Sequence, residues 1–237
     1  MRRALLALLS LVAACGSDSN SPDPGFECLG APIPATAPAT IVVNGQILSN
    51  ALAPTALGGA IITAFRVGVT DSLAVDTSST PGFYSLSLSS GGTPINGYLR
   101  VTHSGQVDTY AYPSRPLFAD LTTNVLMPTS TELGFLGAAV GVTQAAGNGF
   151  IGVIVKDCDG VTLAGATVTT SPAGTVKYNS GSGPSASATS TAADGVAYVF
   201  NVPAGNVTVM ATVSGHTLRQ HAVSARADVV TLTEIQP

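Results

Sequence analysis

The chain has 237 residues, a formal net charge of −4 and only 9% charged residues. This length allows one large domain or two modest ones, and the charged share lies far below the roughly 25% that is usual in globular domains. Because the sequence contains no basic run, the electrostatic footprint of nucleic-acid binding is missing and no nucleic-acid partner is expected.

The first fifteen residues have the pattern of a secretory signal. Arg2 and Arg3 give a positive start, residues 4–14 are apolar except for Ser10, and small residues precede Cys15. A basic start, a short apolar region and small residues before a cleavage point are typical of export. The stretch is too short to cross a bilayer, which takes about 20 apolar residues. A cysteine directly after the small residues resembles the lipobox of bacterial lipoproteins, in which the cysteine becomes the lipidated N-terminus.

This resemblance implies a signal peptide over residues 1–14, lipidation of Cys15 and attachment to a membrane through that lipid. The residue after the cysteine is Gly16 and not an acidic residue. By the same resemblance, an acidic residue there would retain the protein in the inner membrane, so Gly16 favours the bacterial outer membrane. The side of that membrane stays open. The alternative is an ordinary signal with a chance cysteine. Residues 15–39 are rich in Pro and Ser, which disfavours helix and central strand and predicts an extended tether.

From residue 40 the pattern changes to short apolar runs separated by turn residues, which predicts a first β-sandwich over residues 40–128. A connector over residues 129–147 follows, in which Ser130 or Thr131 is expected to cap a short helix. Strands then return over residues 148–237, the second predicted sandwich.

Three blocks of the first sandwich recur in the same order in the second, which indicates an internal duplication. The matched pairs are 59–63 with 165–169, 81–86 with 194–200, and 99–105 with 209–215.

Spaced motifs in the second copy resemble a known family. They are Gly152-Val-x-Val-x-Asp-x-Asp-Gly, Leu163-Ala-Gly-Ala-x-Val, Thr191-x-x-Asp-Gly and Val202-Pro-Ala-Gly-x-Val. Together they look like the carboxypeptidase regulatory-like domain, a transthyretin-like seven-stranded sandwich. The resemblance implies an all-β fold of two tandem, transthyretin-like or Ig-like antiparallel sandwiches. It also implies an accessory role without catalysis. The first copy matches less well, because it lacks the Pro-Ala-Gly turn.

The cysteines predict one cross-link. If Cys15 is lipidated, Cys28 and Cys158 remain, and an even number of cysteines in an oxidising compartment favours a disulfide. Two free thiols are the alternative, because sequence alone does not establish whether their Cα atoms lie close enough.

The sequence carries no recognisable catalytic motif, and we expect no catalytic residue, metal or cofactor. Neither Gly-x-Ser-x-Gly nor His-Glu-x-x-His occurs, and there is no phosphate-binding or dinucleotide-binding loop. Ser104 adjoins His103, but neighbours in a strand point to opposite faces. We expect His103, His216 and His221 at strand ends rather than around a zinc ion.

Three aspartates are candidates for a calcium site, namely Asp157, Asp159 and Asp194. Calcium takes six to eight oxygen ligands, and no complete Asp-x-Asp-x-Asp-Gly loop is present. Hairpin-turn aspartates that accept hydrogen bonds from their own backbone are the simpler interpretation.

Aromatic and basic side chains gather near the end of the first copy, at Tyr98, Tyr110, Tyr112, Arg115 and Phe118. They are the candidate ligand-binding residues, as a sugar-stacking or protein-contact platform, and edge packing is the plainer alternative.

A loop rich in Gly and Ser over residues 177–185 predicts mobility and a variable contact surface. The sequence as a whole predicts a non-catalytic, lipid-anchored envelope protein with a structural or protein-binding role. Its expected partner is an unidentified envelope protein or a glycan. The alternative function is a glycan-binding or adhesion module that uses the region from Tyr98 to Phe118.

Overall fold

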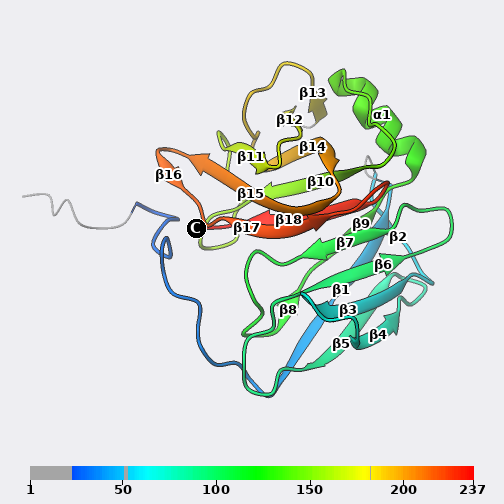
Figure 1. Ribbon diagram of the computed structural model, residues 1–237, viewed down its shortest axis with the longest axis vertical. Helices are drawn as coiled ribbons and strands as arrows, with labels where there is room; N and C mark the ends of the chain where they lie inside the picture. Colours follow the sequence, from blue (N-terminus) through cyan, green and yellow to red (C-terminus); the bar gives the residue numbers. More distant parts are fainter. Residues whose placement is uncertain (1–22, 51–52, 182) are drawn as a thin grey trace, which may run out of the picture.

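The computed structural model describes residues 23–50, 53–181 and 183–237 (Figure 1). The predicted signal peptide and Cys15 therefore lie outside the described residues. Apart from the helix α1 (Ser130–Val140), the regular structure of the described part is β-strand, which confirms the predicted all-β class. No helix in these ranges is long and apolar enough to cross a membrane.

In chain order, the helix α1 divides the strands into two groups, one before it and one after it. We call β1–β9 the first lobe and β10–β18 the second lobe. The first-lobe strands are β1 (Thr40–Ser49), β2 (Thr55–Ala56), β3 (Ile61–Arg66), β4 (Ser72–Thr77), β5 (Phe83–Ser89), β6 (Gly97–Thr102), β7 (Thr109–Tyr112), β8 (Leu121–Thr122) and β9 (Val125–Met127). The second-lobe strands are β10 (Asn148–Val155), β11 (Thr167–Ser171), β12 (Thr175–Ser180), β13 (Gly183–Ser185), β14 (Val196–Pro203), β15 (Gly205–Val213), β16 (His216–Thr217), β17 (His221–Ala225) and β18 (Val230–Ile235).

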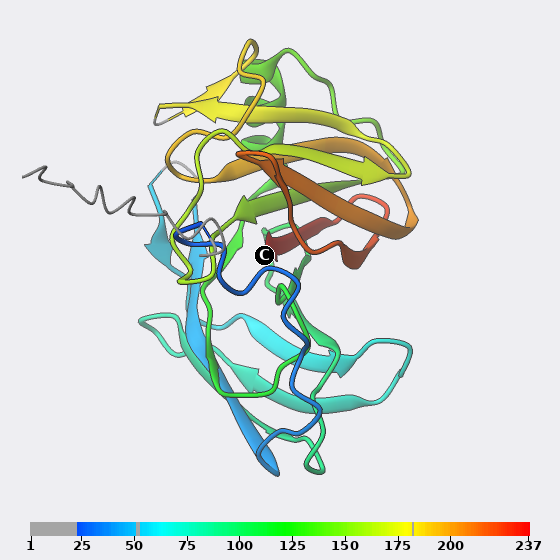
Figure 2. The same cartoon turned by 90° about the vertical axis from the view of Figure 1, so that its left-hand side faces the viewer.

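One sheet is shared by both lobes. Its nine strands follow the order β13-β12-β14-β10-β18-β7-β6-β3-β4, so first-lobe and second-lobe strands lie side by side (Figures 1 and 2). A smaller sheet of β2, β1 and β5, with β8 and β9 on β1, covers the first-lobe half. Another, of β11, β15, β16 and β17, covers the second-lobe half.

The two lobes use opposite faces of the shared sheet. At the junction, β7 pairs with β18 in parallel, and Leu232 aligns with Ala111 while Thr233 aligns with Tyr112. Leu232 and Ala111 pack against the first-lobe core, whereas Tyr112 belongs to the second-lobe core. Neighbouring residues in a strand point to opposite faces. The face of the shared sheet that points away from the first-lobe core therefore points into the second-lobe core.

Parallel pairing is the main departure from the expected antiparallel sandwiches. Besides β7 with β18, the pairs β1 with β8, β1 with β9, and β10 with β18 are parallel. Apolar alternation reports which face of a strand is buried but not the direction of its neighbour, so the sequence pattern did not reveal these pairs.

The two lobes share a pattern of side-chain hydrogen bonds, which in the first lobe is centred on Ser78. The Ser78 Oγ accepts from the backbone N–H of Ala60 at 3.0 Å and donates to the carbonyl of Leu57 at 2.8 Å. Ser78 is buried, so its hydroxyl is satisfied by the two ends of the turn that precedes β3.

The second lobe repeats this arrangement with a threonine. The Thr191 Oγ1 accepts from the N–H of Ala166 at 2.9 Å and donates to the carbonyl of Leu163 at 2.7 Å. Thr191 is also buried. In both lobes, therefore, a buried hydroxyl bridges the two ends of a turn. The turn precedes β3 in the first lobe and β11 in the second.

Three buried clusters hold these layers together. The first-lobe cluster includes Ile41, Ile47, Ile62, Leu86 and Leu88. The second-lobe cluster includes Ile151, Val153, Val199, Val209 and Ile235. A third lies beneath α1 and consists of Val140, Phe150, Phe200 and Val230.

The N-cap of the helix lies one residue before the predicted position. Thr129, rather than Ser130 or Thr131, is the N-cap. Its Oγ1 accepts from the N–H of Glu132 at 3.1 Å, and the Glu132 carboxylate accepts from the N–H of Thr129 at 2.6 Å. This capping box requires the acidic residue three positions after the cap, which only Thr129 satisfies. Gly141 ends the helix in the left-handed conformation.

The predicted mobile loop at 177–185 is wrong for most of its length, because β12 and β13 form a hairpin there. Tyr178 and Asn179 are buried. The Tyr178 hydroxyl accepts from the N–H of Val168 at 2.9 Å, so the hairpin is fastened to β11 across the second lobe.

Residues 23–39, which fall within the predicted tether, contact both lobes, and we call them the strap. The ring of Phe26 stacks on that of His216 at 4.2 Å between centroids. Further along, the N–H of Ala37 donates to the carbonyl of Gly92 at 3.0 Å. The strap therefore leaves the second lobe and reaches the first before β1 begins (Figure 2).

Candidate binding pocket and aromatic junction

The three predicted tyrosines lie together at the junction between the lobes. The ring centroid of Tyr98 is 5.8 Å from that of Tyr110 and 5.1 Å from that of Tyr112. Phe65 extends the row, 5.5 Å from Tyr98. These residues come from the neighbouring strands β3, β6 and β7, and the tyrosines pack against the second-lobe core.

Arg226, which was not predicted, completes this cluster. Its guanidinium carbon lies 3.8 Å from the ring centroid of Tyr110 and 5.2 Å from that of Tyr98. It also donates to the hydroxyl of Tyr112 at 3.2 Å. Burial raises the pKa of Tyr112, and the hydrogen bond from Arg226 opposes part of that rise. No local motif signals Arg226, because its aromatic partners are distant in sequence.

This geometry gives the tyrosines a packing role. Tyr112 is buried, with 5% of its surface exposed, and Tyr98 and Tyr110 are half-buried. Arg226 covers one face of Tyr110. The open surface for stacking a sugar is therefore restricted to Phe65 and the uncovered parts of Tyr98 and Tyr110.

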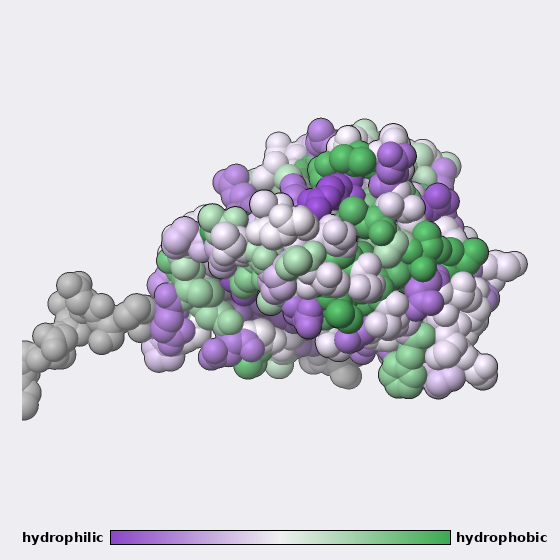
Figure 3. Space-filling model, turned by 90° about the horizontal axis from the view of Figure 1, so that it is seen from below, coloured by the Kyte–Doolittle hydropathy of each residue, from purple (hydrophilic) through white to green (hydrophobic). Residues whose placement is uncertain are grey.

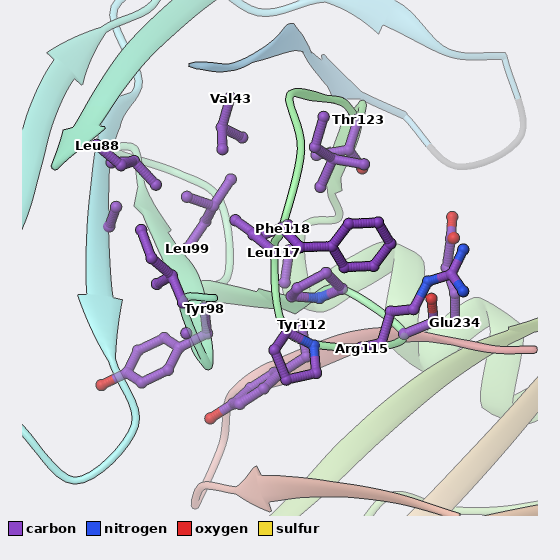
Figure 4. A pocket seen from close by; sticks show the side chains of 18 of the residues that line it. Val43, Leu88, Tyr98, Leu99, Tyr112, Arg115, Leu117, Phe118, Thr123 and Glu234 are labelled. Atoms are coloured by element: carbon purple, nitrogen blue, oxygen red, sulfur yellow. The ribbon is translucent and has the colours of Figure 1, made fainter. Parts of the chain in front are cut away.

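Arg115 and Phe118 line a pocket of about 420 Å³ at the side of the first-lobe core, and Phe65, Tyr98 and Tyr112 of the aromatic cluster also line it (Figure 4). Its floor is buried and consists of Val43, Leu88, Ile95 and Leu99. Its walls are half-buried and include Leu73, Ala111, Leu117, Phe118 and Leu121. On strand β6, Leu99 belongs to the first-lobe core and Tyr98 packs against the second-lobe core, and both residues line the pocket.

Four charged residues line this pocket. Lys156 forms an ion pair with Glu234, and the Asp120 carboxylate accepts from the N–H of Val42 at 2.8 Å. The Arg115 guanidinium lies 5.3 Å from the ring centroid of Phe118 and forms no ion pair with any residue that the structure describes. The pocket therefore combines apolar walls with one cation that lacks a counter-ion in the described ranges.

The three histidines have separate surroundings. His221 shares a 2.7 Å hydrogen bond with the hydroxyl of Thr233, and burial lowers its pKa to about 4. His216 pairs with Asp23 at 2.9 Å, and the Nδ1 of His103 is buried without a protein partner. Within residues 23–50, 53–181 and 183–237, no three His, Cys, Asp or Glu side chains form a metal-binding group.

The aspartates considered for calcium act in turns. The Asp157 Oδ1 accepts from the N–H groups of Asp159 and Val161 at 2.9 and 2.8 Å. The Asp194 Oδ1 accepts from the N–H of Val196 at 3.1 Å. All three contacts are the local hydrogen bonds of turn aspartates.

The predicted disulfide is confirmed. Cys28 and Cys158 are bonded, with their Cα atoms 5.7 Å apart. The N–H of Cys158 also donates to the carbonyl of Gly25 at 2.9 Å. The bond joins the strap to the loop after β10.

Comparison with known proteins identifies no family. No family profile matches the chain, and no curated protein matches it. Solved structures with a partial likeness include pilins of Gram-positive bacteria. The shaft pilin SpaA of Lactobacillus rhamnosus GG is 13% identical, with 84% of this chain and 98% of that chain covered and a TM-score of 0.26. The minor pilin GBS52 of Streptococcus agalactiae is 10% identical, with 83% and 95% covered and a TM-score of 0.25. The major pilin subunit BcpA of Bacillus cereus is 9% identical, with 83% and 99% covered and a TM-score of 0.28. TM-scores this low support no argument about this chain.

Proposed function

We propose that this protein is a lipid-anchored, non-catalytic protein of a bacterial outer membrane with a structural or protein-binding role. The observation that carries the proposal is the bond between Cys28 and Cys158. Disulfides persist in oxidising compartments outside the cytoplasm, which agrees with the export signal before Cys15. The cysteine left over is the one in the lipobox-like position.

The repeated hydrogen bonds of Ser78 and Thr191 support the assignment of two tandem carboxypeptidase regulatory-like sandwiches. A duplicated sandwich with a shared sheet provides a rigid body for presenting surfaces. The contacts of the candidate acids and bases support a role without catalysis, because Asp157, Asp194 and His221 each hold a structural hydrogen bond.

Cell fractionation and mass spectrometry test the anchor. In a Gram-negative host we expect the full chain in the outer-membrane fraction, with an N-terminal peptide that carries acyl groups on Cys15. Acyl chains contribute about 0.8 kcal/mol for each buried CH₂, so Cys15→Ser should leave the protein soluble or unprocessed. Cys28→Ser is the matched control and should remain in the membrane fraction. An unmodified mature N-terminus would refute the lipid anchor.

A glycan-binding function is the second candidate, favoured by the row of Phe65 and Tyr98 on the outer face of the shared sheet. Glycan-array binding that is lost in Phe65→Ala and retained in Phe83→Ala, which removes an exposed ring on β5 away from the row, would support it. An array with no bound glycan would remove it.

A further inference from the structure

We propose that the pocket beside Arg115 binds a single aliphatic chain with an anionic head group, the chemistry of a fatty acid. This inference does not depend on the lipid anchor, because the pocket is lined by the first lobe and by Lys156, Glu234 and Gln236 of the second lobe. It concerns a ligand that the protein would take up, in addition to any acyl group on Cys15.

The pocket walls fit an aliphatic chain. Leu73, Ala111, Leu117 and Leu121 are half-buried and line one continuous space, so an inserted chain removes their remaining apolar surface from water, which is favourable. Figure 4 shows Val43, Leu88, Leu99 and Leu117 around this space. The volume of about 420 Å³ lies at the small end of the roughly 300–1,000 Å³ found for ligand pockets, which suits one chain better than two.

The charges at the pocket favour a negative head group. Glu234 is already paired with Lys156, and the Asp120 carboxylate already accepts a backbone N–H. Arg115 contacts the Phe118 ring and has no carboxylate partner among the described residues. A guanidinium can bind both oxygens of a carboxylate at once, so Arg115 provides the site for the head group.

The loop that carries Arg115 is held at both of its ends. The Ser114 hydroxyl donates to the Gln236 side-chain oxygen at 2.8 Å, and Leu117 exchanges two backbone hydrogen bonds of 2.9 Å with Ile95. The pocket wall is therefore formed before a ligand arrives, which lowers the entropic cost of binding.

Elsewhere, Figure 3 shows apolar residues as separate patches among polar ones on the face seen from below.

Isothermal titration calorimetry with three ten-carbon probes tests this proposal. The protein is the full chain carrying Cys15→Ser, so that no acyl group of its own competes. We expect saturable binding of one decanoate per chain, weaker binding of decan-1-ol and no binding of decyltrimethylammonium. Tight binding of the cationic probe, or no saturable binding of decanoate, would overturn the proposal.

Variants then locate the site. Arg115→Gln should weaken decanoate binding roughly 5- to 10-fold, as expected for a partly exposed charge-assisted contact, and should change decan-1-ol binding less than about twofold, because the alcohol carries no charge for Arg115 to pair with. The matched control is Lys177→Gln, which removes one positive charge from β12 and should leave both affinities unchanged. Equal effects of these two variants would mean that general charge attraction, and not this pocket, binds the probe.

A volume variant provides an independent arm. Ala111→Leu adds side-chain volume at the pocket wall and should abolish binding of decanoate and decan-1-ol alike. Its thermal unfolding shows whether the fold is kept. If Ala111→Leu unfolds, the comparison of Arg115→Gln with Lys177→Gln still tests the proposed pocket. If Ala111→Leu folds and binds both probes normally, the proposed pocket is wrong.

Discussion

Arg226 connects the lobes through the aromatic rings of the first one. Its guanidinium stacks on Tyr110 and donates to the hydroxyl of Tyr112. A cation–π contact contributes about 0.5–2 kcal/mol and a hydrogen bond from a charged donor about 1.5–3 kcal/mol. We therefore expect Arg226→Ala to lower the free energy of unfolding by about 2–5 kcal/mol, measured by urea denaturation.

Arg100 offers the control. It lies on β6, the strand beside β7, which carries Tyr110 and Tyr112. Its guanidinium pairs with Asp108 at 3.0 Å, but both side chains are more than a third exposed. Exposed ion pairs contribute about 0–1 kcal/mol, so Arg100→Ala should cost less than Arg226→Ala. If the two variants are equally destabilised, the stacked arrangement around Arg226 has no special contribution.

His221 predicts a pH dependence of stability. Burial lowers its pKa from 6.5 to about 4 in the folded chain, so the unfolded chain takes up a proton first as the pH falls. The stabilisation present above pH 6.5 is lost between pH 6.5 and 4, by up to about 3 kcal/mol. In urea titrations across this range, His221→Gln should show a shallower loss than the unchanged chain. The same slope in both would mean that His221 is accessible to protons in the fold.

At the scale of the elements, each lobe is built around the same glycine turn before β5 or β14. Gly82 and Gly195 have φ values of +80° and +67°. A Cβ at Gly82 would lie 2.7 Å from the carbonyl oxygen of Ile47, and one at Gly195 would lie 2.4 Å from that of Val155. Backbone conformation and close approach thus both select glycine in both lobes.

This turn gives a matched set of variants. Gly82→Ala and Gly195→Ala should each lower the thermal stability strongly, because they combine a positive φ with a backbone clash. Gly160→Ala is the control, since Gly160 has a φ of +82° and open space around its Cβ position. Strain alone costs about 1–2 kcal/mol. A loss at Gly160 as large as at Gly195 would show that the clash is relieved by relaxation.

How far the sequence predicts the elements depends on whether their contacts are local. The turns at Gly82 and Gly195 were predictable, because short motifs recur around them. The parallel pairing of β7 with β18 was not, since strand periodicity does not specify a distant partner. The candidate site follows the same rule, because Tyr98, Tyr112 and Arg115 share a stretch of sequence and line one pocket, whereas their distant neighbour Arg226 was not predicted.

At the scale of the whole molecule, the shared sheet and the strap impose one arrangement on the lobes. The sheet joins them through β7 and β18, and the strap contacts both. The disulfide closes a loop with a sequence separation of 130 residues, which contains the entire first lobe and α1. The bond therefore constrains the position of the first lobe as well as the strap.

Loss of the disulfide gives the corresponding prediction. Closing a loop of this length stabilises by about 4–5 kcal/mol in the chain-entropy account, and the remaining strap contacts reduce the measured effect. Cys28→Ser combined with Cys158→Ser should lower the urea midpoint and speed hydrogen exchange at Phe26, while exchange in β1 stays slow because Ala37 still bonds to the first lobe. Cys15→Ser, with the disulfide intact, is the control. Two alkylatable thiols at Cys28 and Cys158 in the unreduced, denatured protein would contradict the bond and the constraint on the lobes that follows from it.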